Sequence, residues 1–216
     1  MEICFYHINN DYINFLKKYE REKVRYTCVP NIQYKTSDKF VFGAVMDING
    51  INYFVPVSSY GKKQEDVILI RDKKKKTDIL GSLRFAYMLP VPRPCLIKLD
   101  INSIVNEYSK THISKELAFC RRERDKIFKQ AEKTYFRVIS KVNEQLVKNS
   151  CDFKVLEQAY IEYCIINKLE CPHIDEGSLK FIEETLKIKK YAEAVQEKYN
   201  ERNTGHDEHD KNNPKR

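Results

Sequence analysis

Hydroxyl and ammonium side chains gather at the two outer ends of a segment that the sequence predicts to be a β-hairpin. Two apolar runs, 39–48 and 51–57, meet at Asn49-Gly50, a dipeptide typical of a two-residue hairpin turn. Folding would bring together Tyr34, Lys35 and Lys39 at one mouth and Ser58, Ser59, Lys62 and Lys63 at the other. Hydroxyls and positive charge, without an evident set of metal ligands, suit contact with a phosphodiester.

These groups could support one kind of RNA chemistry. Cleaving RNA without a metal requires alignment of the 2′-oxygen with phosphorus, stabilisation of the phosphorane oxygens and protonation of the 5′-oxygen. RNA supplies its own nucleophile, so Lys39 and Lys62 could counter the phosphoryl charge while Ser59 or Tyr34 hydrogen-bonds the reacting oxygens. The serines also fit a simpler interpretation, an ordinary turn flanked by solvated lysines.

Two other nuclease chemistries are poorly supported. A metal nuclease needs clustered carboxylates or histidines, and the hairpin region offers only Asp38 and Asp47. The five histidines are scattered and make no evident pair: His7, His112, His173, His206 and His209. We expect a structural role for the first of them, and neither a metal site nor a bound cofactor.

Composition favours an anionic partner. The 216 residues carry a formal net charge of +8 with a pI of about 9.0, which favours nucleic acid, although acidic proteins and lipid headgroups would also suit a basic surface. No long apolar span predicts a membrane segment. The seven cysteines are scattered without a CxxC pair, and the N-terminus lacks a secretion signal, so we expect reduced thiols and a cytoplasmic location.

The order of elements predicts an α+β fold, with a largely antiparallel twisted sheet, helices packed on it and a helical C-terminal extension. Strands are expected at 2–8, 39–48, 51–57, 67–71, within 79–89 and at 95–99. Helices are expected from Asn9 or Asn10, with Glu20 facing water, and at 101–108, 114–149, 152–169 and 179–200. Ser114 is the expected cap of the longest helix, and Gly81-Ser82 is expected to interrupt its strand. Pro56 indicates an edge strand or the end of pairing, and Lys73–Lys76 a solvated hairpin tip.

Several stretches, in this order, resemble one protein family. The stretch 39–50, Lys-Phe-Val-Phe-Gly-Ala-Val-Met-Asp-Ile-Asn-Gly, and the stretch 53–59, Tyr-Phe-Val-Pro-Val-Ser-Ser, are similar to the core of the ToxN/AbiQ family. These proteins are the ribonuclease toxins of type III toxin–antitoxin and phage-abortive systems. Segments 12–16, 81–90 and 115–127 extend the resemblance, which covers residues 1 to about 169.

The resemblance implies an active site and a domain layout. The family's catalytic positions match Tyr34, Lys39, Ser58, Ser59 and Lys62. Tyr34 lies one residue farther from Lys39 than is usual in the family, so the Lys35 side chain could enter the site. Tyr60-Gly61 replaces the usual proline and adds a residue, so either Lys62 or Lys63 could be the catalytic lysine. The implied nuclease domain spans 1–170. The resemblance does not explain the region beyond it, where the residue pattern predicts a helical extension over 171–200 and a disordered polar tail over 201–216.

The resemblance also implies an activity and a partner. We expect a metal-independent endoribonuclease that leaves a 2′,3′-cyclic phosphate and a 5′-hydroxyl. Its inhibitor would be a repeated RNA folded as a pseudoknot, held in a basic groove within a closed protein–RNA assembly. The candidate RNA-binding residues are Lys35, Lys63, Arg71, Lys73, Lys74, Lys115, Arg121 and Arg122. The alternative from another class is a non-catalytic RNA-binding module.

Overall fold

A mixed arrangement of strands and helices is present in the computed structural model, which describes residues 3–31 and 40–171. The strands are β1 (Cys4–Ile8), β2 (Val41–Ile48), β3 (Ile51–Ser58), β4 (Val67–Arg71), β5 (Ile79–Arg84), β6 (Leu89–Pro90) and β7 (Leu96–Lys98). The helices are α1 (Asn10–Val24), α2 (Glu107–Arg122), α3 (Arg124–Ile139), α4 (Glu144–Lys148) and α5 (Phe153–Ile166), with 3₁₀ turns at Phe85–Tyr87, Arg93–Cys95 and Ile101–Ser103.

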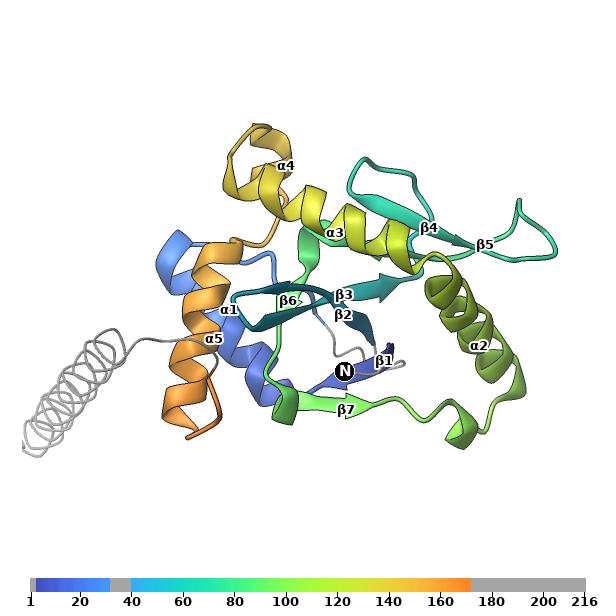
Figure 1. The fold of residues 1–216 in the computed structure, drawn as a ribbon, viewed down its shortest axis with the longest axis horizontal. Coiled ribbons are helices and arrows are strands. Elements are labelled where there is room, and N and C mark those ends of the chain that lie inside the picture. The colour runs from blue at the N-terminus through green and yellow to red at the C-terminus, as the bar shows by residue number, and fades with distance from the viewer. Residues whose placement is uncertain (1–2, 32–39, 172–216) are drawn as a thin grey trace, which may run out of the picture. The chain divides into compact units, whose positions relative to one another are not determined.

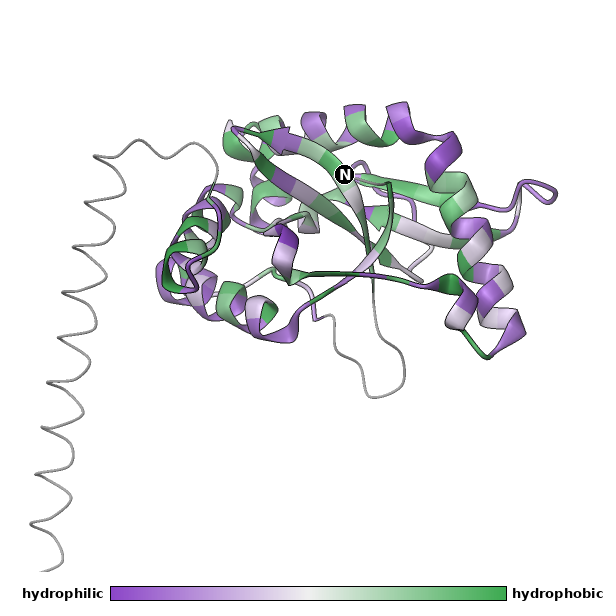
Figure 2. Ribbon diagram, turned by 60° about the horizontal axis from the view of Figure 1, so that its bottom comes forward, coloured by the Kyte–Doolittle hydropathy of each residue, from purple (hydrophilic) through white to green (hydrophobic). Residues whose placement is uncertain are grey.

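The strands form one antiparallel sheet in the order β4-β5-β3-β2-β1-β7, with β6 pairing beside β3 (Figure 1). The expected α+β class is confirmed. Hydrophobic residues follow the central strands, while hydrophilic residues recur along the helices and over the β4–β5 loop at the right of the view (Figure 2). The expected helix over 179–200 and the tail lie outside the described residues.

The central hairpin forms as the Asn-Gly signal predicts. Asn49 and Gly50 both have positive φ, 51° and 82°, as a tight turn between right-twisted strands requires. The Gly50 amide donates to Asp47 Oδ1 at 3.0 Å, so this carboxylate serves the turn. The paired residues run from Ile48 opposite Ile51 to Val41 opposite Pro56, which places the start of β2 beside the end of β3.

Pro56 lies inside the sheet, so the edge-strand alternative is wrong and the loss of pairing is local. On one side Val57 N donates to Phe40 O at 3.1 Å. On the other side β3 pairs with β6 through Tyr53 and Phe54, and with β5 only from Val57 onward. Because a proline has no amide hydrogen, it fits this gap between two partners. The end of β3 is therefore held on both sides.

The helical half is divided differently from the prediction. Asn106, not Ser114, caps α2: its side chain accepts from Ser109 N at 2.8 Å, and Ser114 lies in the middle of the helix. The single helix expected over 114–149 is three helices, because Glu123 leaves helical geometry (φ −93°, ψ 17°) and Lys141 is left-handed (φ 53°). Periodicity alone did not reveal these breaks, because the apolar stripe continues across them.

Two further predictions, for β5 and for Glu20, are wrong. Gly81 and Ser82 do not interrupt β5, since both pair with β4. Glu20 is fully buried rather than solvated, and its carboxylate accepts from Thr27 Oγ1 at 2.6 Å, Cys28 N at 2.8 Å and Asp152 N at 2.7 Å. A buried carboxylate with several donors is satisfied, and here it ties the loop after α1 to the start of α5.

The core lies between the sheet and the helices. Tyr12, Tyr53 and Tyr135 are among its largest fully buried side chains, and Tyr12 Oη donates to Pro90 O at 2.6 Å. The seven cysteines are free thiols. Across residues 3–31 and 40–171, no helix combines the length and apolarity that a bilayer crossing needs.

Candidate functional site

Ser58 and Ser59 lie where β3 leaves the sheet. Ser58 Oγ accepts from Tyr60 N at 3.2 Å, and Ser82 Oγ on β5 donates to Tyr60 O at 2.6 Å. Ser59 is exposed beside this braced turn. Two hydroxyls thus support the turn from within, while the third remains open to solvent.

A cleft of about 310 Å³ opens at the two serines. Its lining comes from the β2–β3 side, from β5 and from one face of α2: Phe40, Val57, Ser58, Ser59, Leu80, Tyr108, Ser109, His112, Ile113 and Glu116. The spacing of Tyr108, His112 and Glu116 at four residues places them on one helical face. A helix distant in sequence therefore completes the site that the hairpin begins.

His112 is not isolated, in contrast to the sequence interpretation. Its Nε2 lies 3.0 Å from Leu80 O and 3.6 Å from Glu116 Oε1. Glu116 is only 4% exposed, and burial raises the pKa of its carboxyl to about 8. The i, i+4 spacing of a histidine and a glutamate was the available signal, but only the fold shows that both reach the serine cleft.

The first mouth of the hairpin is described only from Phe40 onward. Tyr34, Lys35 and Lys39 lie outside the described residues, so their positions in the site stay predictions. Phe40, the neighbour of Lys39 in the chain, lines the cleft and is paired with Val57. The described backbone of this mouth therefore begins at the cleft, with Phe40.

The two candidate lysines after the serines differ in their surroundings. Lys62 Nζ lies 6.0 Å from the centre of the Tyr60 ring, whereas Lys63 lines a separate, larger groove. Arg137 anchors the loop that carries them, since its Nη2 donates to Glu65 Oε2 at 3.1 Å. A role of Lys62 or Lys63 at the serines stays a prediction.

The larger groove has a volume of about 850 Å³ and lies between β4 and the helices α2 and α3. Its basic residues are Lys63, Arg71, Lys73, Lys76, Arg122 and Lys126. Sequence analysis did not single out Lys126, although its position four residues after Arg122 was the available signal. Lys74 and Arg121 are not among the lining residues, and Arg121 Nε instead donates to Ile3 O at 3.3 Å.

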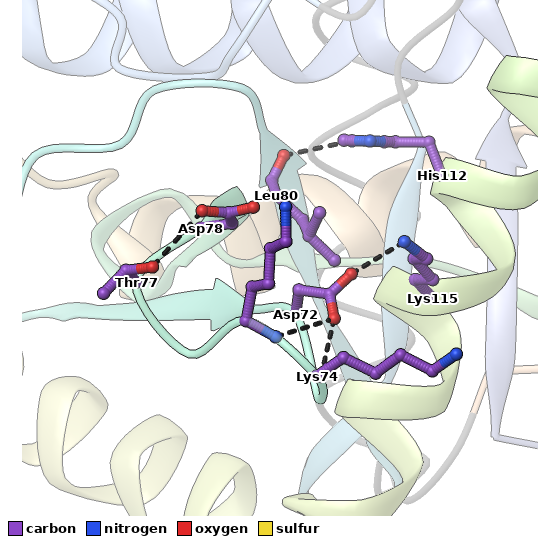
Figure 3. A network of polar contacts seen from close by, with 8 residues as sticks. Asp72, Lys74, Thr77, Asp78, Leu80, His112 and Lys115 are labelled. Atoms are coloured by element: carbon purple, nitrogen blue, oxygen red, sulfur yellow. Dashed lines mark hydrogen bonds and ion pairs between the residues drawn. The ribbon is translucent and has the colours of Figure 1, made fainter.

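Lys115 holds the β4–β5 loop against α2 (Figure 3). Its Nζ lies 2.7 Å from Asp72 Oδ2, and Asp72 Oδ1 accepts from Lys74 N at 2.7 Å and Lys75 N at 3.3 Å. These donors, the Lys115 ammonium first, lower the pKa of Asp72 to about 2. In the same view His112 points to the backbone of Leu80, so one face of α2 is fixed to this hairpin at two points.

Arg84 at the end of β5 is a further cation that sequence analysis missed. Its guanidinium carbon lies 5.2 Å from the Tyr60 ring centre and 4.5 Å from that of Tyr87. The guanidinium is stacked by aromatic rings next to the serine turn. Within residues 3–31 and 40–171 no group of three or more His, Cys, Asp and Glu side chains could hold a metal ion.

Known proteins match this arrangement of sheet and helices. The family described as "Toxin ToxN, type III toxin-antitoxin system" matches residues 4–161. Endoribonuclease AbiQ of Lactococcus lactis subsp. lactis is 29% identical over 168 residues, covering 73% of this chain and 87% of AbiQ. Endoribonuclease ToxN of Pectobacterium atrosepticum is 25% identical over 168 residues, covering 74% and 92%.

Solved structures agree with the sequence matches. The structure of AbiQ, a lactococcal anti-phage endoribonuclease, superposes with a TM-score of 0.67 at 25% identity and covers 76% of this chain and 99% of its own. A type III toxin inhibited by a non-coding RNA pseudoknot superposes with a TM-score of 0.64 at 26% identity, covering 74% and 96%. Fold and sequence thus define a toxin of a type III toxin–antitoxin system. The chain belongs to the ToxN family.

Proposed function

We propose that this chain is a metal-independent endoribonuclease that cuts RNA by transesterification. The 2′-oxygen attacks the adjacent phosphorus, the bond to the 5′-oxygen breaks, and the products end in a 2′,3′-cyclic phosphate and a 5′-hydroxyl. The observation that carries the proposal is the braced Ser58–Ser59 turn at the mouth of a cleft, in a chain whose relatives AbiQ and ToxN are endoribonucleases.

Each candidate residue has a proposed role. Ser59 is exposed at the cleft and would hydrogen-bond the reacting phosphate, while Ser58 and Tyr34 position the RNA. Lys39 and Lys62 would counter the charge that develops on the phosphoryl oxygens. Fixed hydroxyls and ammonium groups meet the charge requirement of this reaction, because the nucleophile comes from the substrate.

The basic groove is the proposed site of an RNA antitoxin. Five of its six cations are exposed, and such side chains bind a phosphate backbone through charge and counterion release. The relative that is inhibited by a non-coding RNA pseudoknot supports a pseudoknot RNA as the partner. We further propose that this RNA is a repeated one and that protein and RNA form a closed assembly. Lys63, Arg71, Lys73 and Arg122 line the groove, while Lys74, Lys115 and Arg121 would contact RNA outside it. Lys35 is a further proposed RNA contact.

Cleavage in EDTA tests the activity. The full chain is incubated with a defined RNA in excess EDTA, and the fragment ends are analysed. Fragments with cyclic phosphate ends support the enzyme, whereas tight, salt-dependent binding of RNA that stays intact supports a non-catalytic module. Cleavage that persists in the double variant Ser59→Ala, Lys62→Ala would contradict the site assignment while leaving the activity in place.

A further inference from the structure

The geometry points to His112 as the base that accepts the proton of the attacking 2′-hydroxyl, with Glu116 as its positioning residue. This inference rests on the proposed ribonuclease activity and adds an imidazole to a site otherwise made of hydroxyls and ammonium groups. His112 lines the same cleft as Ser58 and Ser59, and its side chain is 33% exposed. It is therefore accessible from the space that a phosphodiester would occupy.

The hydrogen bond to Leu80 determines which nitrogen of His112 is the base. Leu80 O can only accept, so His112 Nε2, at 3.0 Å, carries the proton. In the neutral ring Nδ1 then holds the free lone pair. Within the described part of the chain Nδ1 has no hydrogen-bond partner, whereas Nε2 faces both Leu80 O and Glu116 Oε1. Among these residues the ring is thus held through Nε2 alone.

Glu116 lies beside His112 and Leu80, against β5. Its Oε1 lies so close to β5 that a Cβ on Gly81 would come within 2.4 Å of it, and within 3.0 Å of Ser58 O. A side chain at this position would have no space, so the glycine lets the carboxyl pack against the backbone of β5. Among the described residues its ion-pair partner is His112, at 3.6 Å from Oε1 to Nε2, and the buried Cys120 thiol one turn further along α2 is the other ionisable group that it influences.

A buried neutral carboxyl suits a site that must accept a phosphate. Because burial raises its pKa to about 8, Glu116 is largely uncharged at neutral pH and does not repel the RNA. When His112 becomes an imidazolium, the carbonyl of Leu80 and the carboxyl of Glu116 both face the charged ring. The two groups thus stabilise the state that proton transfer creates.

The other titratable groups nearby have partners of their own. On α2, Tyr108 stacks on His112 with ring centres 6.2 Å apart, and Lys115 is paired with Asp72 of the β4–β5 loop. Asp78 of that loop accepts from Thr77 Oγ1 at 3.3 Å. Glu116 is therefore the acidic group in direct reach of the imidazole.

The proposed step balances its protons. The 2′-oxygen gives its proton to His112 Nδ1 as it bonds to phosphorus, and the bond from phosphorus to the 5′-oxygen breaks. The departing 5′-oxygen takes a proton from a lysine ammonium of the site. His112 then releases its proton to water, and the lysine is reprotonated from water.

The test compares His112→Gln and His112→Ala with the wild type by single-turnover RNA cleavage across pH. The glutamine amide can still donate to Leu80 O but cannot accept a proton, so this variant keeps the fold. Both variants should lose about 100-fold or more in rate while still binding a non-cleavable 2′-deoxy RNA. Thr111→Ala, on the exposed side of the same helix, is the matched control and should keep the wild-type rate.

The pH profile separates this chemistry from a structural role. The wild-type rate should fall near the pKa of Glu116, about 8, because a charged carboxylate begins to repel the phosphate. Glu116→Gln should lose this fall in rate. A folded His112→Gln that cuts at the wild-type rate would overturn the inference. A wild type that cuts no RNA would instead refute the proposed function itself.

Discussion

The serine cleft and the basic groove are built in opposite ways. In the cleft, polar groups are few and are fixed at short range, as Ser82 fixes the Ser58–Tyr60 turn and Leu80 fixes His112. In the groove, lysines and arginines extend from β4, the loops on either side of it, α2 and α3, and most of their side chains are exposed. Fixed groups suit the alignment that a reaction needs, whereas exposed charges suit binding to a polyanion. Changes in the cleft should therefore affect the cleavage rate, and changes in the groove should affect RNA affinity.

Removing the hydroxyl of Ser59 should produce the largest effect. Ser59→Ala is expected to lower single-turnover cleavage by roughly 100-fold or more, because a donor to the reacting phosphate is lost. RNA affinity should change little, since the groove is intact. Ser59→Thr keeps a hydroxyl and is the matched control. An equal loss of affinity and of rate would erase the distinction between the two regions.

Changes in the groove should act on binding and on its salt dependence. Removing the charges of Arg122 and Lys126 together should lower the slope of log affinity against log salt by about two, one for each phosphate contact. Cleavage at saturating RNA should stay near the wild-type rate. Lys18→Ala removes an exposed charge on α1 and is the control. An unchanged slope in the double variant would exclude these residues from the RNA interface.

Glu116 should make stability depend on pH. Its pKa in the folded chain, about 8, is above the unfolded value of about 4.5, so the folded state holds the proton more tightly. The free energy of unfolding should therefore be greatest below about 4.5 and should fall as pH rises toward about 8, by an amount on the order of a few kcal/mol. Glu116→Gln should flatten this dependence in urea unfolding measured across pH. Parallel curves for the two proteins would contradict the buried, neutral carboxyl.

Asp72→Asn should have the smallest effect. The pair with Lys115 lowers the pKa of Asp72 to about 2, so its stabilising contribution is present above the unfolded value of about 3.8 and is lost as pH falls through about 2. The variant should melt slightly below the wild type at neutral pH, with the difference shrinking in acid. A constant difference down to about pH 2 would show that the ion pair is not its cause.

The parts of the fold that depend on local chemistry were predictable from the sequence. Asn49-Gly50 forms the hairpin turn, and Asn9 caps α1 by accepting from Asp11 N. Both could be predicted because their interactions span only a few residues. The serines were identified by their place at the end of a strand. The groove cations Arg71 and Arg122 followed from charge, although charge alone did not separate them from Arg121, which contacts Ile3 O.

What the sequence did not reveal depends on contacts between distant segments. His112 reaches the serine cleft only because α2 packs against β5. Its partner there, Leu80, lies 32 residues earlier in the chain. Glu20 is a typical solvated residue by type, yet it accepts hydrogen bonds from the loop after α1 and from Asp152 N. The break between α2 and α3 at Glu123 does not interrupt the helical spacing of the apolar residues. For His112 and Glu20 the deciding partner lies far along the chain. For Glu123 the apolar pattern is the same whether or not the helix breaks there.

The most direct test of the account is a single substitution in the RNA. Once the cleavage position on a defined RNA is mapped, the 2′-hydroxyl of the nucleotide before that position is replaced by hydrogen. We expect the full chain to bind this RNA as it binds the parent but to leave it intact, because the attacking oxygen is missing. Cleavage of the 2′-deoxy RNA at the same position would contradict transesterification and, with it, the roles assigned to Ser59 and His112.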